Sequence, residues 1–123
     1  MTLLADTGAG GDPLFHEAAV WYPRTDSMFF VQNAGAKDAG TGLAKSAIVQ
    51  RISVAEADKY RNERAAVGKV TVETVDANPP VVNPNGGTNW RGKIVFAGEG
   101  MGPDVASALY LMEPEAPYNT TGE

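Results

Sequence analysis

The chain has 123 residues, with 15 acidic against 10 basic side chains and a net charge of −5, so a basic nucleic-acid-binding surface is not expected. It contains no cysteine and one histidine, which excludes disulfides, thiolate zinc sites, cysteine nucleophiles and two-histidine zinc motifs. No apolar run approaches the length of a membrane span. The N-terminus has no basic segment followed by a long apolar one, so we expect no signal peptide and a cytoplasmic protein.

Turn-forming residues separate short apolar runs along the chain: there are 14 glycines and 8 prolines, a pattern typical of all-β proteins. Residues 1–13 are predicted to be a flexible N-terminal segment with a possible short strand. Residues 17–22 and 28–32 predict two strands, and their short connection implies an antiparallel hairpin, because parallel pairing needs a longer crossover. A third strand is expected at 47–52.

The helical signal of this sequence follows the third strand. Ser53 and Glu56 fit a capping box, no glycine or proline interrupts the chain up to Ala66, and Gly68 supplies a stop. These features predict one short helix near 54–66, with its charged side chains forming a solvated face.

The second half repeats the strand pattern of the first half. After a fourth strand at 69–76, near a sheet edge, strands are expected at 92–98 and 106–112, with a weaker candidate at 81–89. The repeat predicts an all-β fold of antiparallel β-propeller blades within residues 14–123. Blade 1 would cover about 17–76, an incomplete blade 2 about 81–112, and a tail 113–123. A β-sandwich is the alternative, and strand order separates the two: a sequential meander for blades, a Greek key for a sandwich.

Four segments together resemble the senescence-marker-protein/gluconolactonase-like lactonase family, nearest to its fungal lactonohydrolase branch. They read FHEAAVWY at 15–22, TDSMFF at 25–30, NGGTNWRGKIVF at 85–96 and LYLMEP at 109–114. The resemblance implies a six-bladed propeller that binds a divalent cation, calcium or zinc, in its channel and hydrolyses a lactone to a hydroxy acid. This chain would supply about one full blade and most of a second.

The resemblance also implies roles for individual residues. Glu17 matches the first metal-ligand glutamate of the family, and hard cations favour such oxygen ligands. Asn85 matches a channel asparagine that contacts substrate or a metal-bound water, and Glu99 follows a strand where some bacterial relatives also carry a glutamate, so both are candidate substrate-binding residues. Asn83 stands near where some members carry an arginine for substrate. The family's catalytic aspartate lies in later blades, so the catalytic residue is unknown for this sequence.

We therefore expect lactonase ancestry with an incomplete catalytic set, a lactone as the substrate of the complete relative, and little or no cation binding or activity by this chain alone. The alternatives are a non-catalytic interaction module and a carbohydrate-binding β-sandwich using Trp21, Tyr22 and Trp90. Two partial blades would leave apolar faces uncovered, with candidates such as Val20, Phe30 and Val95, so we expect self-association. Nucleic acids and membranes are not expected partners.

Overall fold

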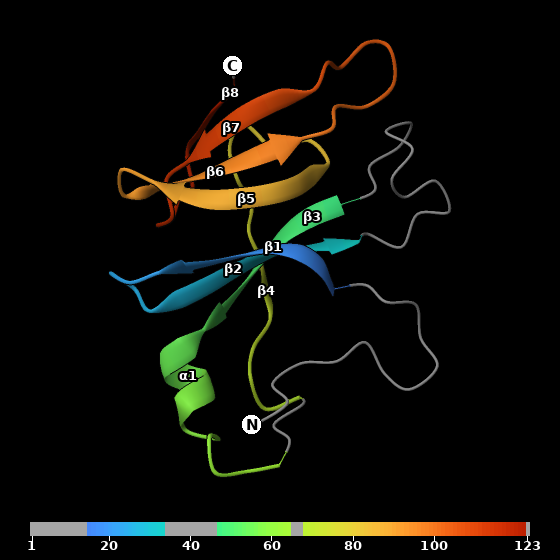
Figure 1. Ribbon diagram of the computed structural model, residues 1–123. Coiled ribbons are helices and arrows are strands. Elements are labelled where there is room, and N and C mark those ends of the chain that lie inside the picture. Colours follow the sequence, from blue (N-terminus) through green and yellow to red (C-terminus); the bar gives the residue numbers. More distant parts are fainter. Residues whose placement is uncertain (1–14, 34–46, 65–67, 123) are drawn as a thin grey trace.

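The computed structural model describes residues 15–33, 47–64 and 68–122. Within these ranges the chain forms two four-stranded antiparallel sheets and one short helix (Figure 1). The elements are β1 (Phe15–Tyr22), β2 (Ser27–Asn33), β3 (Ala47–Ser53), α1 (Val54–Asp58), β4 (Glu73–Thr74), β5 (Pro84–Trp90), β6 (Lys93–Gly98), β7 (Ala108–Met112) and β8 (Thr120–Gly122). The all-β fold predicted from the sequence is confirmed.

Strand order is sequential in both sheets, β1-β2-β3-β4 and β5-β6-β7-β8, and each strand pairs antiparallel with the next. The predicted hairpin of β1 and β2 is confirmed: its last pairs are Trp21 with Met28 and Tyr22 with Ser27. Asp26 closes the turn by donating its backbone N–H to the carbonyl of Pro23 at 3.3 Å. The Greek-key order expected for a sandwich is not found in the two described sheets.

The two sheets stack face to face around a common hydrophobic core (Figure 1). Alternate residues of β1, β2, β6 and β7 point into it, as the two-residue period of a strand requires. Phe29 of β2 and both Ile94 and Phe96 of β6 are completely buried. Burying a side chain of this size contributes about 1.5–3 kcal/mol, so this core ties the halves of the chain together. Its other buried members are Val20, Tyr22, Val31, Val49, Val75, Ala77, Tyr110 and Met112.

The first strands of the two sheets lie against each other. A Cβ atom built on Gly87 of β5 would lie 3.3 Å from the Cβ of Ala18 in β1. Further along, the Asn89 side chain of β5 donates a hydrogen bond of 2.9 Å to the Trp21 carbonyl of β1. In Figure 1 both strands begin on the right-hand side and run to the left, so their N-terminal ends share one side of the molecule.

The predicted helix begins at the expected residue but is much shorter than expected. Ser53 caps it by accepting the Glu56 backbone N–H at 3.1 Å, while the Glu56 carboxylate accepts from Thr71 instead of completing the capping box. The helix ends at Asp58, and 59–64 form turns; residues 65–67 lie outside the described part. Only Ala57 of the helix is buried, and a helix without an apolar stripe gains too little from packing to propagate.

The fourth strand is also shorter than the predicted 69–76, since only Glu73–Thr74 pairs with β3. Before it, Val70 leaves the sheet to pack beside Ala57 in a small second cluster. After it, the side chains of Val75 and Ala77 enter the main core. Packing of these apolar residues, rather than strand pairing, sets the path of this segment.

The segment predicted as a tail at 113–123 contains a further strand, so the second sheet has one strand more than the three predicted between 81 and 112. Thr120–Gly122 pairs with β7, so the second sheet has four strands. The Glu113 backbone N–H donates to the Asn119 carbonyl, and that of Tyr118 to Glu115, so the turn brings the chain back onto β7. The predicted N-terminal segment 1–13 lies outside the described residues. None of the helical structure described is long and apolar enough to cross a membrane.

Candidate functional site

Two of the predicted site residues are hydrogen-bonded to each other. The Nδ2 atom of Asn85, in β5, donates to Oε1 of Glu99, just after β6, at 2.8 Å. The pairing of β5 with β6 brings the two side chains together. Pro84, next to Asn85, pairs with Gly98, next to Glu99, and the β5–β6 register shifts between Pro84 and Gly87. The Asn85-Gly86 dipeptide, which could also be a simple turn, thus lies in an irregular part of a strand. Asn85 is half-buried and Glu99 exposed, so a ligand can reach the pair.

Hydrogen bonds hold the backbone around Glu99 in place. Its N–H donates to the Asn83 carbonyl at 3.0 Å, and its own carbonyl accepts from Ser107 Oγ at 2.8 Å. The next carbonyl, that of Gly100, accepts from Asn83 Nδ2 at 2.8 Å. The carboxylate of the pair therefore stands on a fixed turn.

Glu17, the predicted metal ligand, lies in the N-terminal half of β1, where the strand is irregular. The register with β2 shifts on both sides of Glu17, and the following residue, Ala18, has a φ of 57°. The side chain of Glu17 is half-buried. Because the starts of β1 and β5 and the end of β6 lie on one side of the molecule (Figure 1), Glu17 is on the same side as the Asn85–Glu99 pair.

The described residues do not form a metal site by themselves. Among them no three His, Cys, Asp or Glu side chains lie close enough together to hold an ion. Calcium takes about six to eight oxygen ligands, and one carboxylate is not sufficient. The assignment of Glu17 as a metal ligand stays a prediction, and the geometry of the described residues supports no chemical step through a cation.

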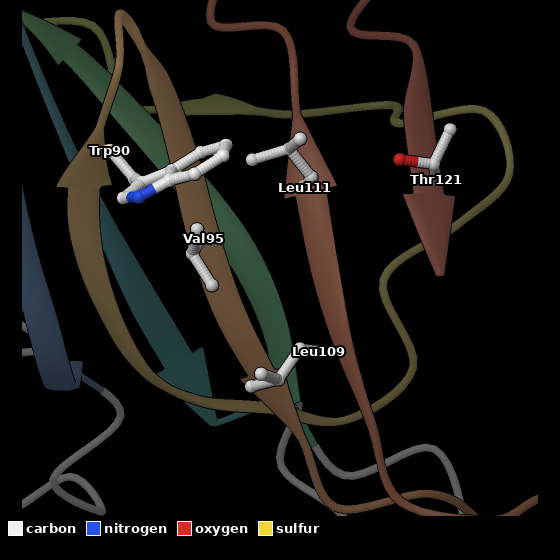
Figure 2. Close-up of a pocket in the computed structure, with 5 residues that line it drawn as sticks. All are labelled: Trp90, Val95, Leu109, Leu111 and Thr121. Atoms are coloured by element: carbon white, nitrogen blue, oxygen red, sulfur yellow. The ribbon is translucent and has the colours of Figure 1, made fainter. Parts of the chain in front are cut away.

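A second feature is a hollow on the second sheet, β5 to β8, on the face directed away from the core. Figure 2 shows a hollow there, with Trp90 extending across the sheet toward Leu111 above Val95. Its volume is about 370 Å³, and its largest exposed side chains are Trp90 at 48% and Leu109 at 58%. We call Trp90, Val95, Leu109 and Leu111 the outer face.

Sequence reasoning finds part of the outer face. Val95 is expected on an uncovered surface, and it lines the hollow. Val20, expected to be uncovered for the same reason, is only 3% exposed because the second sheet covers it. Sequence reasoning misses Leu109 as an outer-face residue; its alternation with the buried Tyr110 in the last long strand is the signal that could have found it.

Comparison with known proteins adds no assignment: no family model, curated protein or solved structure matches this chain.

Proposed function

We propose that the two sheets are neighbouring blades of a lactonase-like β-propeller, and that Asn85 and Glu99 contact a lactone in it. The observation that supports this most is the 2.8 Å hydrogen bond between these two side chains. The family resemblance points to the two residues on separate grounds: Asn85 matches an asparagine that contacts substrate or a metal-bound water, and Glu99 matches a glutamate position of some relatives. Asn85 lies in β5, whereas Glu99 follows β6. Sequential strand order and the face-to-face stacking of the sheets are consistent with adjacent blades.

The pair has hydrogen-bonding capacity left for a ligand. Glu99 uses one carboxylate oxygen in the bond, and Asn85 uses one N–H. The second Glu99 oxygen, the Asn85 carbonyl oxygen and the other Asn85 N–H have no further partner within the described residues. Two acceptors and one donor side by side complement a hydroxylated lactone, whose hydroxyls donate and whose ring and carbonyl oxygens accept.

Glu17 enters this proposal as one carboxylate of a cation site that needs further oxygen ligands from outside the described residues. The resemblance likewise assigns the catalytic carboxylate to later blades. We therefore propose that the present 123 residues bind a lactone but do not open its ring at a measurable rate.

Calorimetric titration with a γ-aldonolactone, run beside a ring-opening assay with added calcium or zinc, tests this proposal. Asn85→Ala should weaken lactone binding about tenfold, because it removes the hydrogen bonds of one half of the pair. Asn89→Ala is the matched control, since its side chain also donates one hydrogen bond, to the Trp21 carbonyl in a different place. Lactone binding that is equally strong in Asn85→Ala, or absent from the unmodified chain, would contradict the assignment.

A non-catalytic interaction module is the second candidate function, and the outer face favours it. Trp90 and Leu109 remain about half exposed, and clustered exposed apolar side chains are typical of association surfaces. We propose that the chain self-associates through this face. This candidate is compatible with lactone binding at the Asn85–Glu99 pair, because the two features use different residues.

A further inference from the structure

Asn83 is a buried polar residue beside the exposed Asn85–Glu99 pair. It is only 2% exposed, and burying a carboxamide is costly unless it is hydrogen-bonded. Its Nδ2 donates to the Gly100 carbonyl at 2.8 Å, and its own backbone carbonyl accepts the Glu99 N–H at 3.0 Å. One residue thus bonds to the turn on both sides of the Glu99 side chain.

The backbone of Asn83 is adapted to this place. Its φ is +45°, a region that asparagine enters more readily than most residues with a side chain. Asn83 lies two positions before Asn85, so the conformation of its backbone helps to determine where β5 begins. Asn83 therefore connects the strand that carries the amide to the turn that carries the carboxylate.

The turn itself leaves little room for rearrangement. A Cβ added to Gly98 would lie 2.5 Å from the Tyr110 ring and 2.6 Å from the Val82 carbonyl oxygen. A Cβ added to Gly100, whose φ is +78°, would collide with the Val105 carbonyl oxygen. The chain is closely packed on both sides of Glu99, so this turn has little freedom to move. The hydrogen bonds from Asn83 therefore restrain the position of Glu99.

We propose that Asn83 is a positioning residue for the Asn85–Glu99 pair, an inference that rests on the proposed function of that pair in lactone binding. Asn83 does not reach a ligand itself, since it is buried. It holds the turn after β6 at the place where Glu99 Oε1 accepts the Asn85 hydrogen bond, so that the free groups of the pair have a fixed spacing before any ligand arrives. Such preorganisation lowers the ordering cost of binding.

A purely structural role for Asn83 makes a different prediction. It would lower stability without changing the coupling between the Asn85 amide and the Glu99 carboxylate in molecules that remain folded. The discriminating readout is the NMR signal of the two Asn85 side-chain amide protons, compared with and without the additional substitution Glu99→Ala. A hydrogen bond to the Glu99 carboxylate makes these signals respond to that substitution.

Two variants and one control provide the test. Asn83→Asp keeps the shape and the tolerance of positive φ but replaces the N–H donor by an acceptor, and Asn83→Gly keeps the backbone freedom without any side chain. In both we expect the response of the Asn85 amide signals to Glu99→Ala to fall about fivefold, the effect of one net hydrogen bond on the population of the hydrogen-bonded pair. In Asn89→Ala the response should equal that of the unmodified chain.

An undiminished Asn85 response in folded Asn83→Asp would overturn the positioning role. If the substitutions unfold the chain, hydrogen exchange in the unmodified protein decides: the Asn83 side-chain amide should exchange as slowly as the backbone N–H of Glu99, and rapid exchange would overturn the inference. Neither readout uses lactone. A chain with the coupling but without lactone affinity would thus refute the proposed function and leave the positioning role intact.

Discussion

Replacing Gly87 by alanine tests how closely β5 packs against Phe96 of its own sheet and Ala18 of the first sheet. A Cβ at this position would lie 2.9 Å from two atoms of the Phe96 ring and 3.3 Å from the Ala18 Cβ. The Phe96 ring is completely buried and cannot move away without disturbing the core. Overpacking of this kind costs about 1–3 kcal/mol.

The neighbouring Gly86 offers a matched control, because a Cβ there would meet no atom within 4 Å. Neither glycine has a positive φ, so alanine at either position restricts the unfolded chain and stabilises by about 0.4–1 kcal/mol. That gain cancels between the two variants. The difference in unfolding free energy should therefore be about 1–3 kcal/mol in favour of Gly86→Ala, from the steric clash alone.

Urea unfolding followed by circular dichroism measures this difference. With a typical slope of about 1–3 kcal/mol per molar urea, Gly87→Ala should unfold roughly 1 M earlier than Gly86→Ala. Equal midpoints, or a more stable Gly87→Ala, would refute the close packing of Gly87 against Phe96 and Ala18.

Three further predictions concern metal binding, association and pH. In calorimetric titrations with calcium or zinc, this chain should bind the ion weakly or undetectably, and Glu17→Gln should not change that result. Tight stoichiometric binding that survives the substitution would show that the metal-ligating residues are others than Glu17. Leu109→Lys should shift the chain toward monomers in sedimentation velocity at micromolar concentration, and Met101→Lys, an exposed residue outside the outer face, should not; association unchanged by Leu109→Lys would exclude this face. Burial, aided by the Glu73 carboxylate, raises the pKa of Tyr118, so its neutral form is favoured in the folded state. Stability should hold up to about pH 10, the ordinary tyrosine pKa, and decrease as the pH rises through the raised value. Urea midpoints of Tyr118→Phe should decrease less steeply over the same range, and parallel decreases would exclude a contribution from Tyr118.

The strands that the sequence predicted well are those with strong apolar alternation. The run predicted at 92–98 is β6, Lys93–Gly98, because alternate residues such as Ile94 and Phe96 fill the core while their neighbours do not. The strand predicted at 17–22 is likewise contained in β1. In such segments the side-chain pattern and the tertiary environment agree, so local reasoning is sufficient.

Elements fixed by distant contacts were predicted poorly. Thr120–Gly122 is too short to show the alternation of a strand, and its pairing with β7 depends on the turn at 113–119. The helix expected near 54–66 buries only Ala57, and a capping signal cannot reveal how little of a helix will be buried. Helix length and edge-strand pairing are tertiary properties in this chain.

The candidate site was only partly accessible from the sequence. The resemblance pointed to Asn85 and Glu99 separately, and the structure adds that they are hydrogen-bonded. Strand alternation assumes a regular ladder, so it could not reveal the two register shifts around Glu17 or the positive φ of Ala18. Metal binding and lactonase activity stay predictions.

Mapping a lactone by heteronuclear NMR is the most direct test of the central claim. On addition of a γ-aldonolactone, the largest shift changes should fall on the Asn85 side-chain amide and on the backbone amides of Glu99 and Gly100, and in Asn85→Ala the changes at Glu99 and Gly100 should need about tenfold more lactone. Shift changes confined to the outer face around Trp90 and Leu109, or no saturable change anywhere, would contradict lactone recognition by the Asn85–Glu99 pair.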